Sequence, residues 1–355
     1  MGLWFGIVVC VNLSLVLALL PCIVLGRPAG FDNKADSESC DYINGEWVYD
    51  ASLPLYNSSS CPFITTAFDC QKNGRPDKDY LKYQWKPSNC VLPKFNGEDF
   101  LERNRGKKIM FVGDSISDNM MVSLACLLHS AVPTSTYTTD ATSIHFQDYG
   151  VSILYTQSGF LVDLVDQQGS KVLKLDSIST GNKWQGVDML IFNTYHWWFH
   201  TGHLQKWNYF EVEGKLQKDM DRLKALGTAW TTWANWVDTN VDPSKTKVFY
   251  QGVATTHQDA REWKDPTATD CRGQTEPIKG SKYPGMSIQG EAVIKSIISK
   301  MTKPVYFLDI TLLTQLRKDG HPSVYAGGGD DCSHWCVPGA PDAWNQILYA
   351  ASLGK

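Results

Sequence analysis

The sequence predicts an α/β fold in which a mostly parallel sheet carries helices on both faces. Beyond about residue 105, short apolar runs of strand length alternate with longer segments of helical period. Alternation of this kind is typical of a parallel sheet that is covered on both sides. The composition agrees, because 43% hydrophobic and 20% charged residues in a chain of 355 allow a packed core.

The first predicted strand is Lys107–Gly113, an apolar run that ends at a glycine. A polar turn separates it from a helix candidate at Ser117–His129. Further apolar runs of strand length are Val151–Tyr155, Phe160–Val165, Val187–Phe192, Lys247–Gly252 and Pro304–Asp309. We assign these elements to one domain that covers residues 106–353.

The clearest helical pattern runs from Val212 to Val237, with apolar residues at steps of three and four. Trp230 and Trp233 belong to this stripe, so we expect them in the core rather than on a ligand platform. The segment Pro341–Leu353 is predicted to form the closing helix.

Residues 40–105 have a different character. They contain four cysteines and five prolines, and no helical period persists for more than about a turn. A segment this small buries little core, so it needs disulfides or a larger partner. We therefore predict a small disulfide-rich N-terminal domain packed on the α/β domain.

Residues 1–26 form an apolar leader. No side chain from Leu3 to Gly26 is charged, and the stretch is long enough to cross a bilayer. Pro21 and Gly26 also offer a cleavable end, as in a signal peptide. A signal anchor and a cleaved signal both fit, and both place residues 27–355 on the luminal or extracellular side.

Eight cysteines lie outside the leader, and an even number in an oxidising compartment predicts four disulfides. They are Cys40, Cys61, Cys70, Cys90, Cys126, Cys271, Cys332 and Cys336. Residue spacing alone leaves their pairing open. The sequon Asn57-Ser58-Ser59 lies in a polar stretch, and we predict a glycan on Asn57.

The charge pattern disfavours nucleic acid as a partner. The chain has 33 basic and 37 acidic residues, a net charge of −4, and no long run of one sign. It therefore offers no basic footprint for a phosphate backbone. Its 13 tryptophans indicate flat ligands such as sugar rings, or an aromatic-rich core.

Gly113-Asp114-Ser115 falls where a predicted strand gives way to a helix. A serine at this point is exposed near helix N-terminal amides that stabilise an oxyanion, and a glycine permits a tight turn. Ser115 is thus a candidate nucleophile. The structural alternative is a helix N-cap.

A serine nucleophile needs a base and an orienting acid. Asp331 and His334 lie three residues apart in a glycine-rich loop, so the carboxylate can reach the imidazole Nδ1–H. With Ser115 they form a candidate triad, and the neighbouring Cys332 and Cys336 would lock the loop through disulfides. Zinc binding by these cysteines with His334 is the alternative, but it lacks a spaced partner pair.

Asn193 follows a predicted strand, and its amide can donate to an oxyanion alongside the Ser115 and Gly113 N–H groups. The histidines 196, 200 and 203 have spacings that invite zinc, but no acidic residue follows nearby. We expect no bound metal here, and a sugar-binding aromatic wall instead. The candidates for substrate contact are His196, Trp197, Trp198 and Trp335.

Three blocks resemble the plant trichome birefringence-like proteins: GDSISDN at Gly113–Asn119, FNTYHWWFHTG at Phe192–Gly202, and DCSHWCVPGAPDAWNQIL at Asp331–Leu348. The cysteine-rich segment also resembles their N-terminal domain, so the resemblance covers roughly residues 40–353. It implies an SGNH-like three-layer α/β/α esterase domain. It also implies residence in the Golgi membrane, with a single span and a luminal domain, and O-acetylation of cell-wall polysaccharide such as xylan.

The resemblance carries residue roles. Ser115 matches the nucleophile, Asp331 and His334 complete the triad, and Asn193 and Gly113 neighbour the oxyanion site. No bound cofactor is implied, but an acetyl donor is required. The disulfide pairing implied by the order of the cysteines is Cys40–Cys90, Cys61–Cys126, Cys70–Cys336 and Cys271–Cys332.

The chain departs from the family at Val253–His257, where many members read Ser-Pro-Thr-His after the strand. The change bears on substrate choice more than on mechanism, and we interpret His257 as structural. The predicted reaction is a double displacement through acetyl-Ser115. A wall acetylesterase using the same triad and secreted after cleavage of the leader, and a non-catalytic pectin- or glycan-binding protein, are the alternatives.

Overall fold

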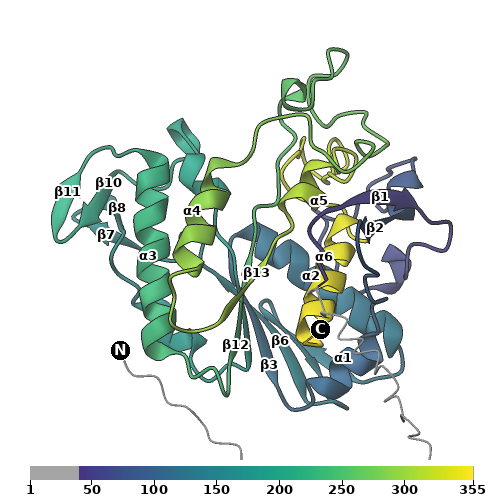
Figure 1. Cartoon of the computed structure of the whole chain (residues 1–355), viewed down its shortest axis with the longest axis horizontal. Coiled ribbons are helices and arrows are strands. Elements are labelled where there is room, and N and C mark those ends of the chain that lie inside the picture. Colours follow the sequence, from purple (N-terminus) through teal and green to yellow (C-terminus); the bar gives the residue numbers. More distant parts are fainter. Residues whose placement is uncertain (1–39, 355) are drawn as a thin grey trace, which may run out of the picture. The chain divides into compact units, whose positions relative to one another are not determined.

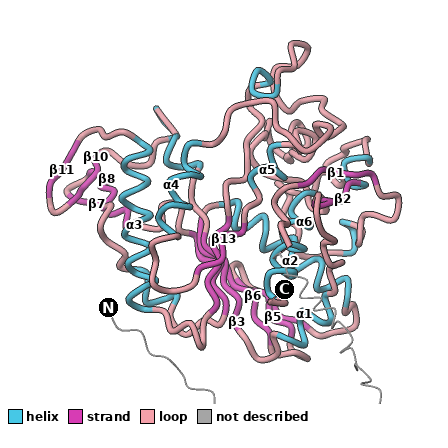
Figure 2. Tube along the Cα trace, in the orientation of Figure 1, coloured by secondary structure: helices cyan, strands magenta, loops and turns pink. Residues whose placement is uncertain are grey.

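The structure, a computed structural model, describes residues 40–354 (Figures 1 and 2). The leader predicted at residues 1–26 lies outside this range. Across the described residues, no helix combines the length and apolarity that a bilayer span requires.

A seven-stranded sheet with strand order β13-β12-β9-β3-β6-β5-β4 forms the centre of the fold. Its five strands from β13 to β6 are parallel, and β5 and β4 add an antiparallel edge. The bounds are β3 Lys108–Gly113, β4 Tyr137–Thr139, β5 Ser143–Phe146, β6 Val151–Gln157, β9 Met189–Phe192, β12 Lys247–Gln251 and β13 Val305–Leu308. The mostly parallel sheet predicted from the sequence is confirmed.

Side chains of β3 alternate between two cores, as the period of a strand requires. Ile109 and Phe111 belong to one buried cluster, and Met110 and Val112 belong to a second. The first cluster includes apolar residues of α1 (Gly97–Arg103), α2 (Ser115–Ala131) and α6 (Ala340–Ser352). The second includes residues of α3 (Arg222–Asn240) and α4 (Gln289–Ile298), so helices cover both faces (Figure 1). The predicted three-layer α/β/α class is confirmed.

The helix predicted from Val212 onward begins only at Arg222, where the Asp221 carboxylate caps it by accepting from Lys224 N. Residues before it form strands instead, because the left-handed Glu213 and Gly214, with φ of 50° and 70°, make a tight turn. Trp230 and Trp233 are buried in the core, as predicted.

This turn joins two strands of a separate four-stranded sheet, with order β11-β10-β8-β7. Its strands are β7 Asp163–Gln167, β8 Ser170–Lys174, β10 Tyr209–Val212 and β11 Lys215–Gln217. The run Phe160–Val165 was predicted as a strand of the main domain. It instead contains Leu161 at φ 58°, and its strand starts only at Asp163, in the smaller sheet.

The N-terminal segment shares the first core rather than forming one of its own. Its strands β1 (Gly45–Tyr49) and β2 (Tyr83–Pro87) pair antiparallel, and Trp47 and Trp85 lie in the same buried cluster as α2 and α6. The Trp47 indole donates to Leu313 O over 2.8 Å, beside α5 (Thr311–Gln315). Short 3-10 helices span Ser58–Ser60, Asp79–Lys82, Thr180–Trp184, His196–Phe199, Gly202–Leu204 and Ala260–Trp263.

Within the described residues, four disulfides are formed, and their pairing is the one that the family resemblance implied. They are Cys40–Cys90, Cys61–Cys126, Cys70–Cys336 and Cys271–Cys332. Two of them join the N-terminal segment to the α/β core, one at α2 and one at the loop after His334. Small segments that cannot bury enough apolar surface are stabilised in this way.

Candidate active site

Ser115 is the first residue of α2 and follows directly on β3. The N-cap of this helix is Asp114, whose carboxylate accepts from Ile116 N over 2.9 Å. The interpretation of Ser115 as a helix cap is therefore wrong, and its hydroxyl is free for other partners. At the first helical position its N–H also lacks an intrahelical acceptor, which makes it available to an anion.

The predicted partners meet this hydroxyl. The Ser115 hydroxyl donates to His334 Nε2 over 2.6 Å, and His334 Nδ1–H donates to Asp331 Oδ2 over 2.6 Å. The second contact settles the tautomer, because a carboxylate only accepts. His334 thus presents an unprotonated Nε2 to the serine, as a general base requires.

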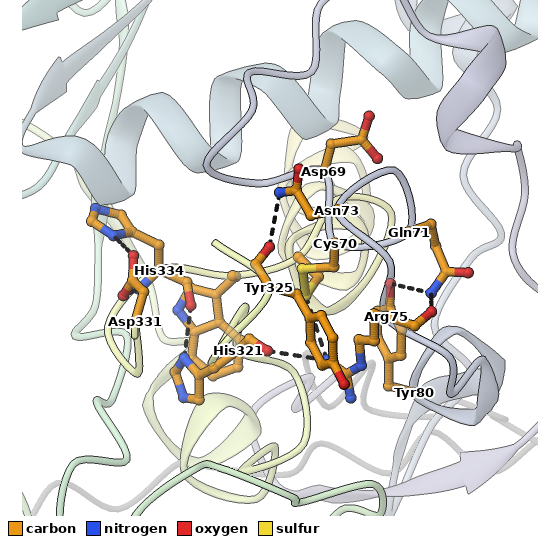
Figure 3. Close-up of a disulfide and its surroundings, with 12 residues drawn as sticks. Asp69, Cys70, Gln71, Asn73, Arg75, Tyr80, His321, Tyr325, Asp331 and His334 are labelled. Carbon is orange, nitrogen blue, oxygen red and sulfur yellow. Dashed lines mark hydrogen bonds and ion pairs between the residues drawn. A yellow bond between two sulfur atoms is a disulfide. The ribbon is translucent and has the colours of Figure 1, made fainter. Parts of the chain in front are cut away.

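The loop that carries Asp331 and His334 is held by several independent contacts. The second carboxylate oxygen of Asp331 accepts from the backbone N–H groups of Ser333 and His334, over 2.8 and 3.0 Å. The backbone of Asp331 pairs with Ser323 in an isolated β-bridge. Figure 3 shows the disulfide beside this loop and the hydrogen bond between Asp331 and His334.

The interaction between Asp331 and His334 favours an ionised carboxylate and a protonated imidazole. Burial lowers the pKa of His334, but the hydrogen bond and negative charge of Asp331 outweigh burial and raise it above its usual value. Burial likewise raises the pKa of Asp331, and the bond to His334 outweighs it and holds that pKa well below its usual range. Asp331 is therefore ionised near neutral pH and stabilises an imidazolium at His334.

Gly113 has a different role from the one predicted. It is the last residue of β3, and a Cβ there would lie 2.4 Å from Asn193 O and from Ser117 Oγ. The glycine is thus required by the close approach of two backbones rather than by a tight turn. Asn193 is buried, with its backbone N–H donating to Val112 O. Neither residue lines the cavity at Ser115.

A cavity of about 430 Å³ opens at the triad. Its lining residues are Asp114, Ser115, Ile116, Tyr195, His196, Trp197, Phe199, His200, Thr256, Gln258, Ser333 and His334. His196 and Trp197 are therefore placed where a substrate would lie. Tyr195, Phe199 and their neighbours were missed as individual residues, although the aromatic density of 195–199 was a signal for the wall. Thr256 belongs to the segment Val253–His257 that departs from the family, and Gln258 gave no signal, because polar loop residues are common.

Two of the four predicted contact residues are in the wrong place for stacking. Trp198 is fully buried, packs edge-on to Phe160 and donates to Thr194 Oγ1. Trp335 is fully buried as well, between His321 and Trp344. Each follows a cavity-lining residue in the chain, Trp197 and His334 respectively. Adjacency in the chain therefore did not predict which side chain faces the cavity.

Asp114, which is buried, and His196, which is half-buried, lie in the wall of the cavity beside Ser115. Within the described residues, Asp114 Oδ2 and His196 Nε2 lack hydrogen-bond partners. Burial raises the pKa of Asp114 and lowers the pKa of His196, and the opposite charges partly offset both effects. Both residues add polar atoms to the wall beside Ser115.

A wider groove of about 870 Å³ adjoins this cavity. Tyr195, His196, Phe199 and Thr256 line both. The far wall of the groove comes from residues 259–264 and 283–289, which bring two acidic and two basic side chains: Asp259, Arg261, Glu262 and Lys264. The groove is thus extended, partly aromatic and balanced in charge.

The zinc alternative at the loop of His334 loses its cysteine ligands. Cys332 and Cys336 are joined in disulfides to Cys271 and Cys70. From Cys40 to Gly354, no group of three or more His, Cys, Asp or Glu side chains is arranged to hold a metal ion.

A Ser-His-Asp set at the carboxyl edge of a three-layer α/β sheet is the arrangement of a serine esterase or acyltransferase. Sequence comparison agrees, because residues 92–351 match the model of the GDSL/SGNH-like acyl-esterase family found in Pmr5 and Cas1p. Residues 38–91 match the PMR5 N-terminal domain.

Relatives in Arabidopsis thaliana are similar over nearly the whole chain. Protein trichome birefringence-like 42 is 54% identical over 91% of this chain and 91% of its own length. Protein trichome birefringence-like 39 is 52% identical over 88% and 87%. Protein trichome birefringence-like 43 is 48% identical over 97% and 96%. The chain belongs to the trichome birefringence-like family.

Proposed function

We propose that this protein is an O-acetyltransferase that transfers acetyl groups to hydroxyls of a plant cell-wall polysaccharide, xylan or a related glycan. The observation that carries the proposal is the continuous hydrogen-bonded chain Asp331–His334–Ser115 at the mouth of a cavity. Membership of an acyl-esterase family supports the acyl chemistry, and the groove beside the cavity supports an extended acceptor.

The first half-reaction forms the acetyl-enzyme. The Ser115 oxygen attacks the acetyl carbonyl of the donor while its proton moves to His334 Nε2. The Ser115 N–H donates to the oxyanion that develops on the carbonyl oxygen, with Asn193 proposed as a further donor. As the intermediate collapses, the donor's leaving group takes the proton from His334. An acetyl-serine remains.

The second half-reaction reverses these roles. A sugar hydroxyl attacks the acetyl-serine, and its proton moves to His334 as the new ester bond forms. The Ser115 oxygen then leaves and takes that proton, which restores the free enzyme. Water is the competing nucleophile, so the acceptor must be held close to the ester. We propose that Trp197 and His196 line the sugar side of this contact.

The neutral balance of charge in the groove supports an uncharged glycan as acceptor. Two acidic and two basic side chains line it, so a polyanionic chain would gain little overall attraction. We also propose that residues 3–26 anchor the enzyme in the Golgi membrane with its catalytic domain in the lumen, and that Asn57 carries a glycan. Asn57 is exposed, as glycosylation requires.

The test compares the full-length wild type with Ser115→Ala, and with Ser130→Ala at the far end of the same helix as the matched control. Each is incubated with an aryl acetate and xylan oligosaccharides, and separately with acetylated oligosaccharides. Mass spectrometry follows the acetyl groups. We expect acetyl gain in the wild type and in Ser130→Ala, and none in Ser115→Ala.

A serine-dependent loss of acetyl groups without gain would make the protein a wall acetylesterase. This second candidate has the same triad and differs only in the nucleophile that resolves the acetyl-serine. No serine-dependent change on xylan, mannan or pectin fragments would contradict both enzymes and leave glycan binding without catalysis.

A further inference from the structure

Two buried imidazoles lie directly behind the catalytic loop and have no part in the proposed chemistry. They are His257 and His321, with 0% and 1% of their surface exposed. His257 Nδ1 lies 2.7 Å from His321 Nε2, and His321 Nδ1 lies 2.7 Å from the carbonyl oxygen of His334. Figure 3 shows the second contact, which joins the ring of His321 to the backbone of the candidate base.

Two neutral imidazoles carry only two hydrogens for the three contacts of this path, which ends at a carbonyl oxygen on each side, His334 O and Gln315 O. The contact to His334 O is the shorter of the two end contacts, so we assign a hydrogen to His321 Nδ1, and Nε2 of the neutral ring is then an acceptor. His257 Nδ1 must therefore donate to it. The remaining nitrogen, His257 Nε2, lies at the longer distance of 3.0 Å from Gln315 O. It gains a hydrogen only as an imidazolium, and burial lowers the pKa of His257 to about 4.

His321 is held on its other sides as well. Its ring packs on Trp335, with 4.1 Å between ring centroids. Its backbone carbonyl accepts from Arg75 Nη1 over 3.0 Å. Arg75 belongs to the N-terminal segment and is 6% exposed. It also donates to Asp319 O over 2.8 Å and pairs with Asp77 (Figure 3 shows Arg75 reaching His321).

The two imidazole residues hold the catalytic loop at two points. The backbone N–H of His257 donates to Cys332 O over 3.0 Å, and the side chain of His321 donates to His334 O. These carbonyls lie one and three residues after Asp331. Any shift of this backbone moves His334 Nε2 relative to Ser115, and a displacement of about 1 Å costs roughly 100-fold in rate.

We propose that His321, held by His257 and by Arg75 of the N-terminal segment, is a positioning residue for His334. The N-terminal segment thereby contributes to the geometry of the active site and does more than cover the core. The proposal rests on the proposed function in one respect, because it takes His334 as the base.

The first test is independent of turnover. Nitrogen-15 NMR of the full-length protein with labelled histidine reports which ring nitrogen carries hydrogen, and single histidine variants assign the signals. At neutral pH we expect His257 and His321 to be neutral and protonated at Nδ1. A His321 protonated at Nε2 would overturn the proposal, because it could not donate to His334 O.

The second test replaces His321 by leucine and by asparagine, whose side-chain amide can donate from a place close to that of Nδ1. For Ser115-dependent hydrolysis of an aryl acetate, we expect His321→Leu to lower kcat roughly 10- to 100-fold with KM unchanged. His321→Asn should recover most of that loss. The matched control is His145→Leu, a half-buried histidine that contacts Ser152 at the start of β6, the end of the sheet opposite to Ser115.

Wild-type kcat in a folded His321→Leu protein would overturn the proposal, and so would equal losses in the leucine and asparagine variants. If the leucine variant does not fold, the kcat of His321→Asn and the protonation of the His321 ring nitrogens still test the proposal. If the wild type shows no Ser115-dependent turnover, the proposed function fails. The His334 Nδ1–H resonance then serves as the readout: we expect it to move in the His321 variants, and an unchanged resonance would overturn the positioning role.

Discussion

The two sides of the active site are built in opposite ways. On the catalytic side, residues 323–336 are held by two disulfides, a β-bridge and buried donors such as Arg75 and His321. On the groove side, the lining residues Phe199 and Met286 are exposed, by 40% and 88%. The difference teaches that the residues proposed for the chemistry are held by many contacts, while those proposed to face the substrate keep free surface.

The largest expected effect tests the rigid side at its acid. Asp331→Asn removes the acceptor that orients His334, and we expect kcat to fall about 10⁴-fold, as tautomer loss does in serine enzymes. The pH at which the residual activity of the variant falls on acidification should also differ from that of the wild type. Because Asp331 raises the pKa of His334, wild-type kcat/KM should fall as pH drops through a value above 6.5, and the variant should retain its rate to lower pH. An unchanged pH profile would contradict this electrostatic role.

A second prediction separates disulfides by their place. Replacing Cys70 and Cys336 by serine removes the link to the catalytic loop, and we expect a loss of about 2–5 kcal/mol in unfolding free energy together with a lower kcat. Replacing Cys40 and Cys90 should cost stability of the same order but leave the kcat of the folded protein unchanged. Denaturant unfolding and aryl acetate hydrolysis measure the two quantities. Equal kcat in both double variants would contradict the prediction that the disulfide at the catalytic loop matters for activity and the other one does not.

A third prediction concerns the support of the rigid side at α6. The half-buried Asp342 accepts from the Tyr56 and Ser123 hydroxyls, and desolvation raises its pKa to about 6. The folded state therefore binds more protons than the unfolded state between about pH 4 and 6, so stability falls as pH rises through that window. The expected loss is about 3 kcal/mol. Asp342→Asn should flatten the dependence in denaturant titrations, and a wild-type curve that is already flat would contradict it.

The smallest effect is expected on the groove side. Phe199 contacts Tyr195, with 4.9 Å between ring centroids, and lines both the cavity and the groove. Phe199→Ala should raise the KM for an oligosaccharide acceptor roughly two- to tenfold, since an aromatic contact contributes about 0.5–1.5 kcal/mol. Aryl acetate hydrolysis and stability should stay near wild type. The control is Leu204→Ala, because Leu204 is also exposed but does not line the groove. An equal rise in KM for Leu204→Ala would contradict the assignment of Phe199 to acceptor binding.

Sequence reasoning worked best where a local pattern meets a buried face. The run from Lys107 predicted β3, because a strand buried on both faces is continuously apolar. Ser115 was predicted from its position at the end of that strand, and Asp331 and His334 were predicted from the base and acid that a serine nucleophile needs. It failed at Val212–Met220, where helical spacing occurred by chance across a hairpin. The spacing of apolar residues does not reveal that Glu213 and Gly214 adopt a left-handed backbone conformation.

The aromatic residues show the same limit from another side. Trp197 and Trp198 are adjacent in the chain, yet one lines the cavity and the other is fully buried. Their residue type predicted an aromatic wall, but which ring faces the cavity depends on the 3-10 turn at His196–Phe199 and on the core that receives Trp198. His257 and His321 are 64 residues apart, and nothing in their sequence context pairs them.

The sequence by itself determined the α/β class and the oxidised cysteines, and it predicted Asp331, His334 and Ser115 as acid, base and nucleophile, because these depend on local period and on the chemistry of residue types. The tertiary structure decided the distances between Ser115 and His334, the burial of Trp198 and Trp335, and the contact from Arg75 through His321 to the catalytic loop. Each of these joins residues far apart in the chain. Such contacts are set by how layers pack, and packing is a property of the whole core rather than of any segment.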